Sequence, residues 1–326
     1  MVVKVPKPLL FLLFSLIFLN ILLLFLNFSK KQNKKVSIIN IDSSAKPPLR
    51  PLPTEKPADI DNFFTIAAVG DISLAREVNF QIQQRNDPNF PFLKTAEILK
   101  KADFTLGNLE SPLIENCPTI RTGVIFCGQI TNISGLVFAG FDAVNLANNH
   151  ILNYGLNGFN ETLKTLNENK IDYFNEKNIL YKKIKNINFA LLGFDDIVRP
   201  INKTFLAEII KKAKENADFI VVNFHWGSEY EETPSLRQKE LAYFTIDQGA
   251  DLILGHHPHT LQPLEYYKEK PIIYSLGNFV FDQMWSEETK KGAIAEITID
   301  TARKKISDVN FVPILIEDSC QPVPIF

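Results

Sequence analysis

Short apolar segments alternate with amphipathic segments along most of the chain after residue 61. Strands that are buried on both faces have continuous apolar runs rich in β-branched and aromatic residues. The runs of this kind are FFTIAAVG, ADFTLGN, FDAVNLAN, NFALLGF, DFIVVNF, DLILG and PIIYSLGN. Between them, residues 156–169, 204–217 and 235–250 repeat apolar residues at helical spacing. Strands that alternate with helices predict an α/β domain with a largely parallel sheet.

The helical segments also indicate which side chains face the core. The predicted core residues are Leu156, Phe159, Leu163 and Leu166 in the first segment, and Phe205, Ile209 and Ala213 in the second. The third segment begins at a capping Ser235 and stops at Gly249. After it, GAIAEITID and KISDVNFVPILI predict a closing pair of antiparallel strands.

The N-terminal part of the chain has a different pattern. Residues 8–29 contain no charged side chain. As a helix they would be about 33 Å long, enough for a bilayer core of about 30 Å. A cleaved signal peptide would need a shorter apolar region and a small-residue cleavage site. A buried core helix is not expected to be apolar on every side at a chain terminus. We therefore predict an uncleaved transmembrane anchor.

This anchor divides the chain into five parts. An N-terminal tail (1–7) precedes the anchor (8–29), and a linker (30–61) rich in proline and lysine follows it. The predicted domain covers 62–318, and a C-terminal tail covers 319–326. Lysines on both sides of the anchor leave its orientation undecided. We expect a single-pass protein of the cell membrane whose domain lies outside the cytoplasm.

Composition narrows the classes of function. The formal net charge is -2, and lysine and arginine are scattered along the chain. No basic face is evident, so a nucleic-acid partner is not expected. Cys117 and Cys127 bracket a short loop and could pair in an oxidising compartment, with Cys320 left over.

Polar residues follow five of the predicted strands. They are Asp71; Asn108 and Glu110; Asn148, Asn149 and His150; His225; and His256, His257 and His259. All five histidines of the chain are in this set. In open α/β sheets, ligands bind outside the carboxyl ends of the strands. These residues therefore predict one metal site at that edge.

The residue types restrict the metal. Imidazole and carboxylate without thiolate suit divalent Mn, Fe, Zn or Co, as one or two ions. Two ions about 3.5–4 Å apart clamp the attacking and leaving oxygens in phosphoester hydrolysis. Residues i and i+2 of an extended segment point to the same side. His257 and His259 should therefore face the site together, while His256 points elsewhere.

Six motifs in order resemble the CapA family of capsule and poly-γ-glutamate synthesis proteins. They are VGDISLAR, GNLESPL, GFDAVNLANNHILNYG, VVNFHWGSEY, GADLILGHHPHTLQPLE and IIYSLGNFVFD, within about residues 64–316. That family is similar to the calcineurin-like metallophosphoesterases. The resemblance implies a four-layer α/β/β/α sandwich.

The resemblance also implies a role for each site residue. Asp71 and His259 would bind the first metal, and Glu110 would bridge both. Asn149, His225 and His257 would complete the second site. His150, beside Asn149, would be the proton donor or a contact to the transition state.

Two positions depart from the pattern of these relatives. Ser73 stands where a metallophosphoesterase has a histidine, which leaves the first site one ligand short. We therefore expect one tightly held and one labile ion. Asn153 stands where the family usually has an aspartate, and its neutral side chain would weaken proton transfer by His150.

These observations leave several functions open. The first is a membrane-anchored, metal-dependent hydrolase of capsule or poly-γ-glutamate biosynthesis or export, acting on a phosphoester or a polymer bond. The second is a non-catalytic subunit that binds an anionic polymer together with synthesis or export proteins. A third, an independent phosphodiesterase or nuclease, is disfavoured because no basic stripe is present.

The predicted anchor can be tested by protease treatment of intact cells. If residues 8–29 span the membrane and the domain lies outside, protease should cut the linker and release a soluble fragment. Cleavage that occurs only in ruptured cells would show that the orientation is wrong.

Overall fold

The computed structural model describes residues 37–39 and 62–325. Within these residues, no helix is long and apolar enough to cross a membrane. The predicted tail (1–7) and anchor (8–29) lie outside the described residues, as does the linker (30–61) apart from strand β1 (Ser37–Ile39).

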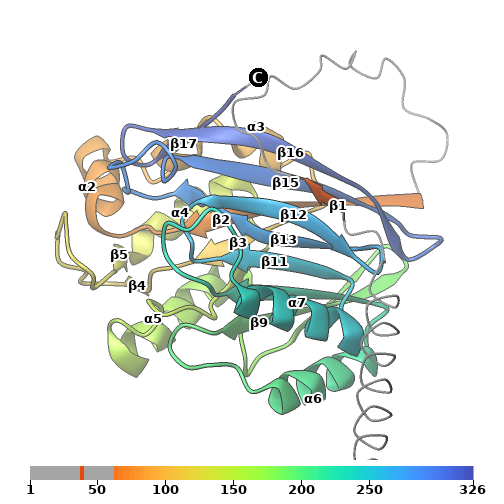
Figure 1. The fold of residues 1–326 in the computed structure, drawn as a ribbon. Helices are drawn as coiled ribbons and strands as arrows, with labels where there is room; N and C mark the ends of the chain where they lie inside the picture. Colours follow the sequence, from red (N-terminus) through yellow and green to blue (C-terminus); the bar gives the residue numbers. More distant parts are fainter. Residues whose placement is uncertain (1–36, 40–61, 326) are drawn as a thin grey trace, which may run out of the picture. The chain divides into compact units, whose positions relative to one another are not determined.

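Two large sheets form the domain (Figure 1). The first has the order β1-β12-β13-β11-β10-β9-β8. After β1 its strands are β12 (Leu261–Tyr267), β13 (Lys270–Leu276), β11 (Leu252–His256), β10 (Phe219–His225), β9 (Ile187–Asp195) and β8 (Leu180–Ile184).

The second sheet has the order β17-β16-β15-β2-β3-β6-β7, and β14 also pairs with β2. Its strands are β17 (Gln321–Pro324), β16 (Lys305–Glu317), β15 (Lys291–Asp300), β2 (Phe63–Ile72), β3 (Phe104–Leu109), β6 (Ala143–Asn145), β7 (Asp172–Phe174) and β14 (Asn278–Val280). A small third sheet pairs β4 (Leu113–Ile114) with β5 (Gly128–Gln129).

Helices cover the outer faces of the two large sheets. They are α2 (Arg76–Arg85), α3 (Ala96–Leu99), α4 (Ile133–Ala139), α5 (Gly155–Glu168), α6 (Lys203–Lys214) and α7 (Leu236–Gln248), with short 3-10 turns at Phe90–Phe92 and Ile130–Asn132. Figure 1 shows α6 and α7 side by side next to the first sheet.

Three clusters of apolar side chains fill the interfaces between these layers. One lies between the sheets, for example Leu106 of β3 with Leu254 of β11. A second joins α2, α4 and α5 to the second sheet, and a third joins α6 and α7 to the first. Burial of apolar surface on both faces of each sheet is the main stabilising contribution. The predicted α/β fold is confirmed, with helices outside two central sheets. The largely parallel sheet expected from the pattern is not what forms: both sheets are mixed, since β12 and β8 in the first and β15, β16 and β17 in the second pair antiparallel with their neighbours.

The sequence pattern located most elements but misplaced two core positions. Each of the seven apolar runs contributes a strand, and β15 and β16 pair antiparallel as predicted. Leu156, in the first turn of α5, is 71% exposed. Phe205 is 38% exposed, and Leu206 and Ile210 are buried in α6 together with the predicted Ala213, while the predicted Ile209 is partly buried. Because apolar residues are adjacent in this helix, the sequence pattern could not decide which of two neighbouring positions faces the core.

The predicted C-terminal tail (319–326) contains an element of the sheet. Residues Gln321–Pro324 form β17 and pair antiparallel with β16. Cys320, just before it, is fully buried. Sheet pairing therefore continues beyond the predicted domain end at residue 318.

The parallel strands of both sheets bring their carboxyl ends to the same region. In the second sheet β2, β3, β6 and β7 are parallel, and in the first β9, β10, β11 and β13 are parallel. A close backbone contact joins the sheets there, since the Asp71 N–H donates to the Gly277 carbonyl at 3.0 Å. A Cβ at Gly70 would lie 2.0 Å from that oxygen, so this crossing requires glycine.

The disulfide between Cys117 and Cys127, which the sequence left open, is present, and Cys320 is free. It closes a loop between residues 10 apart in sequence. A cross-link of this span stabilises the folded protein by roughly 2–3 kcal/mol, mainly by restricting the unfolded chain.

A variant with both Cys117→Ser and Cys127→Ser should therefore unfold at lower urea concentration. A Cys320→Ser variant is the control for loss of a thiol. An unchanged midpoint for the double variant under non-reducing conditions would contradict the expected contribution.

Candidate metal centre

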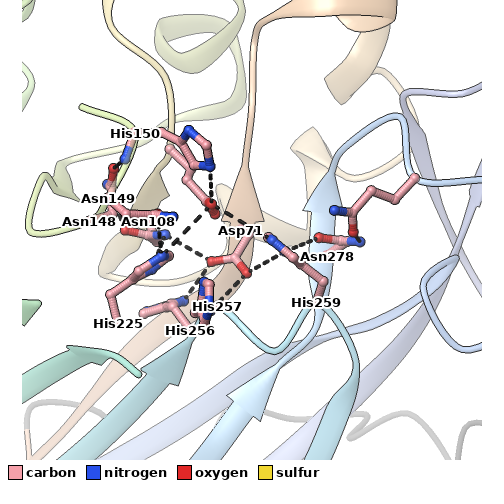
Figure 2. Close-up of polar contacts among 12 residues, drawn as sticks. Asp71, Asn108, Asn148, Asn149, His150, His225, His256, His257, His259 and Asn278 are labelled. Carbon is pink, nitrogen blue, oxygen red and sulfur yellow. Dashed lines mark hydrogen bonds and ion pairs between the residues drawn. The ribbon is translucent and has the colours of Figure 1, made fainter. Parts of the chain in front are cut away.

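The polar residues that follow the strands gather into one buried cluster between the two sheets. Asp71 lies in β2, Glu110 follows β3, and His225 ends β10. Asn149 and His150 follow β6, and His257 and His259 follow β11. Figure 2 shows Asp71 in the middle, surrounded by His225, His256, His257 and His259. The sequence therefore predicted correctly that these residues would come together.

Glu110 is a buried carboxylate without a hydrogen-bond partner on either oxygen. Its Oε1 lies 3.7 Å from His259 Nε2, 3.8 Å from His225 Nε2 and 3.9 Å from His150 Nε2. Burial, with the nearby charge of Asp71, raises the pKa of Glu110 well above its usual value. A buried, unpartnered carboxylate is costly unless a proton or a cation compensates it. The residues around it fit a divalent cation.

Asp71, in contrast, is surrounded by donors. Its Oδ1 accepts from Asn108 Nδ2 at 2.8 Å, and its Oδ2 accepts from the His257 N–H at 3.1 Å. Burial opposes ionisation of this group. Its contacts with His256 and His259 nevertheless hold the pKa of Asp71 well below its usual value. The carboxylate is therefore ionised and available to a cation at neutral pH.

Two groups of side chains could each hold a metal ion. Glu110, His257 and His259 form one, and Asp71, Glu110 and His225 form the other, with potential ligand atoms within 4.8 Å of one another. Glu110 belongs to both groups, as a bridging ligand would.

The imidazoles and the amide of Asn149 complete the donor set. His225 Nε2 lies 2.9 Å from Asn149 Oδ1. Burial lowers the pKa of His225 well below its usual value and lowers that of His257 to about 4. Metal ligation requires neutral imidazole, so both rings are in the competent state at pH 7.

The backbone explanation for His257 and His259 was wrong, although both side chains reach the cluster. We expected an extended segment, but φ is 94° at His257 and 57° at His259. Both values lie in the left-handed region, which costs a non-glycine residue on the order of 1–3 kcal/mol. A tight turn around Pro258, rather than strand alternation, brings the two rings together, with centroids 5.8 Å apart.

The prediction for His256 was also wrong. Its ring does not point away from the cluster, because its Nδ1 lies 3.4 Å from Asp71 Oδ1. His256 still belongs to β11, where alternate side chains face the second sheet. Leu252 and Leu254 lie in the cluster between the sheets, and His256 continues their face.

Asparagine side chains fix the orientation of several groups, and sequence reasoning gave them no such role. Asn278 donates to Gln283 Oε1 at 3.0 Å and to the Thr289 carbonyl at 2.9 Å. Its oxygen must therefore accept, and it lies 2.9 Å from His259 Nδ1. His259 consequently carries its proton on Nδ1 and turns an unprotonated Nε2 toward Glu110. Asn278 follows the strand-like run PIIYSLG, so its position at a strand end was an available signal.

Asn108 has the equivalent role for Asp71. Its Oδ1 accepts from Asn145 Nδ2 at 3.0 Å and from Asn148 Nδ2 at 3.2 Å. These bonds direct its amide nitrogen toward Asp71 and toward His225 Nδ1, which is 3.3 Å away. Asn108 was identified as a polar residue at a strand end, but its orienting function depends on partners that only the fold brings together.

His150 lies at the edge of the cluster with a defined tautomer. Asn153 Oδ1 accepts from the Phe126 N–H at 2.7 Å and lies 3.0 Å from His150 Nδ1. The His150 ring stacks on Phe126 with centroids 3.8 Å apart. Burial lowers the pKa of His150, although Asn153 favours the protonated ring. Asn153 thus keeps the orienting contact that the family's aspartate would make, without its charge.

Ser73 is buried, and its Oγ has no hydrogen-bond partner. Its backbone N–H donates to the Val280 carbonyl at 2.8 Å. This serine, at which the resemblance implied a missing ligand, therefore has an unsatisfied hydroxyl close in sequence to Asp71.

Comparisons with known proteins agree with this architecture. The family model described as bacterial capsule synthesis protein PGA_cap matches residues 65–283. The chain is 36% identical over 289 residues to the capsule biosynthesis protein CapA of Bacillus anthracis, covering 80% of this chain and 69% of that protein. It is 33% identical over 260 residues to the PGA biosynthesis protein CapA of Bacillus subtilis (strain 168), covering 72% and 68%.

A solved structure extends the likeness to the fold. The crystal structure of a phosphatase from Mycoplasma pneumoniae matches with a TM-score of 0.53 and 13% identity, covering 79% of this chain and 95% of that chain. At this identity the likeness concerns the fold alone. The family model and the two similar relatives show that the chain belongs to the CapA family of bacterial capsule synthesis proteins.

Proposed function

We propose that this protein is a metal-dependent hydrolase of capsule or poly-γ-glutamate biosynthesis that acts on a phosphoester or polymer bond. The observation that carries the proposal is Glu110. It is a fully buried carboxylate with two unpartnered oxygens, and three imidazole nitrogens lie 3.7–3.9 Å from one of them. Such a group has a physical rationale as a bridging ligand and none as a core residue.

The ligand sets are those that the family resemblance implies. Asp71, Glu110 and His259 would hold a first ion, while Glu110, Asn149, His225 and His257 would hold a second. As the side chains lie without an ion, Glu110 is grouped with His257 and His259 on one side and with Asp71 and His225 on the other, so Glu110 is shared in either pairing. At such a site, two divalent ions would activate water and would neutralise charge that develops on phosphoryl oxygens. Mn, Fe, Zn and Co all suit this mixture of carboxylate, amide and imidazole donors.

His150 and Asn149 would contact the reacting group. His150 Nε2 lies 3.9 Å from Glu110 Oε1, close enough to the bridging position to reach a leaving oxygen. Its stacking on Phe126 and its contact with Asn153 hold the ring in place. To donate a proton, the ring must first gain one at Nε2, and burial makes this harder at neutral pH.

The cellular setting belongs to the same proposal. Residues 8–29 would anchor the chain in the cell membrane, with the domain outside the cytoplasm. The Cys117–Cys127 disulfide supports an oxidising compartment. The names of the two CapA relatives refer to capsule and PGA biosynthesis, which supports partners among capsule-polymer synthesis proteins. Export proteins and an anionic polymer complete the proposed set of partners.

A second candidate is a non-catalytic subunit that uses the same site to bind anionic polymer. The neutral side chains at Ser73 and Asn153 favour it, because both weaken the catalytic pattern of the superfamily. Metal binding without turnover of a generic phosphodiester or of poly-γ-glutamate would support this candidate.

Metal loading and turnover test the hydrolase directly. The wild-type domain should bind divalent metal by calorimetry, and it should hydrolyse bis(p-nitrophenyl) phosphate slowly in a reaction that chelator abolishes. Glu110→Gln should abolish both the metal binding and the turnover. It should also raise the melting temperature of the metal-free protein by about 2 °C or more, because it removes a buried carboxyl group whose ionisation is not compensated by any partner. A Glu110→Gln variant that still binds metal as tightly as wild type would exclude Glu110 as a bridge.

Restoring the family's aspartate beside His150 tests the proton donor. Asn153→Asp keeps an oxygen for the Phe126 N–H and places a negative charge next to His150 Nδ1. The pKa of His150 should rise, so the falling limb of turnover with pH should move to higher pH. The pH–rate profile measures this shift, and the His150→Ala background is the control. The same displacement in that background would show that His150 is not the donor.

A further inference from the structure

The first ion lacks a ligand at Ser73, and the structure places an unassigned histidine beside the same site. His256 is 1% exposed, and its Nδ1 has no hydrogen-bond partner. That atom lies 3.4 Å from Asp71 Oδ1. A nitrogen buried this completely is expected to have a partner.

The other ring nitrogen of His256 indicates which atom is free to bind. Its Nε2 lies 3.4 Å from Asn223 Oδ1, an acceptor on the neighbouring strand β10. When Nε2–H donates to this oxygen, Nδ1 keeps its lone pair and directs it toward Asp71. Second ring nitrogens of metal-binding histidines commonly make this kind of contact.

The separation of His256 Nδ1 from Asp71 Oδ1 is the one expected of two ligands of the same ion. Ligand atoms each about 2.1 Å from a tetrahedral ion lie about 3.4 Å from one another. Asp71 Oδ1 already accepts from Asn108 at 2.8 Å, and a carboxylate oxygen has a second lone pair for an ion.

We propose that His256 is a fourth protein ligand of the first ion, bound through Nδ1 beside Asp71, Glu110 and His259. The inference rests on the proposed metal centre. In this arrangement an imidazole from β11 replaces the one that Ser73 does not supply, and the first site is no longer short of a ligand. The first ion would then be held as firmly as the second, contrary to the expectation from sequence of one labile ion.

The experiment compares wild type with His256→Ala, His256→Gln and Thr245→Val by calorimetric zinc titration. His256→Ala should weaken the first ion by roughly 100-fold or more, beyond the loss typical of residues that only orient ligands. His256→Gln should weaken it equally, because glutamine can hydrogen-bond to Asp71 but is a poor ligand for zinc. Thr245→Val removes a buried, unpartnered hydroxyl of α7 outside the cluster and should leave zinc binding unchanged. Thermal unfolding of each metal-free variant checks that it is folded.

X-ray absorption of the zinc-loaded protein counts the imidazole ligands of the bound zinc. This count would not change if His256 only stabilised the fold. Wild type should show one imidazole more per pair of ions than His256→Ala loaded at saturating zinc. Ser73→His in the His256→Ala background should restore that imidazole and the lost affinity.

The outcomes separate the two levels of the proposal. If the wild-type domain binds no zinc, the proposed metal-dependent function fails. If it binds zinc and His256→Ala binds it equally well, only the role of His256 is overturned. Retention of full affinity by His256→Gln would also overturn it, by showing that Nδ1 acts through a hydrogen bond to Asp71.

Discussion

Two carboxylates buried side by side are the constraint on which the centre of this protein depends. Asp71 and Glu110 are both fully buried, and the charge of Asp71 is among the causes that raise the pKa of Glu110. Two like charges in a medium of low polarity repel strongly and lose their hydration. Asp71 is compensated by donors from Asn108 and the His257 backbone, whereas Glu110 has none. The electrostatic imbalance therefore falls on one residue at the junction of the two sheets, where a cation would remove it.

Asparagines make this arrangement specific. Because Asn108 and Asn278 each satisfy one end of the amide with fixed partners, the other end can present only a donor or only an acceptor. Neutral amides thus determine the orientation of Asp71 and the tautomer of His259 without adding charge to an already charged cluster. This explains why polar residues without a charge are so frequent at these strand ends.

The sequence predicted those features that follow from periodicity and from strand ends. Continuous apolar runs located the central strands, and the residues after them located Asp71, Glu110, His225 and the histidines of the β11 end. The hydrophobic pattern could not specify the face of α6, because Phe205, Leu206, Ile209 and Ile210 offer two neighbouring stripes. It also could not show that His256 remains in the strand while the chain turns at His257, since the left-handed backbone there is imposed by packing and not by residue type. The comparisons confirm the family, whereas the pairing of ligands that the resemblance implies stays a prediction, because no local pattern contains it.

The left-handed conformations at His257 and His259 have a consequence for how this loop can change over time. Glycine and, to a lesser extent, asparagine are the residues that such backbone angles favour. Replacing either histidine with glycine would relieve local strain but would remove an imidazole. At these two positions, the residue that favours stability therefore differs from the residue that favours ligand binding. A relative without a functional requirement for these imidazoles could therefore acquire glycine here and become more stable. Retention of histidine at both positions would then be a sign that a lineage still uses the site.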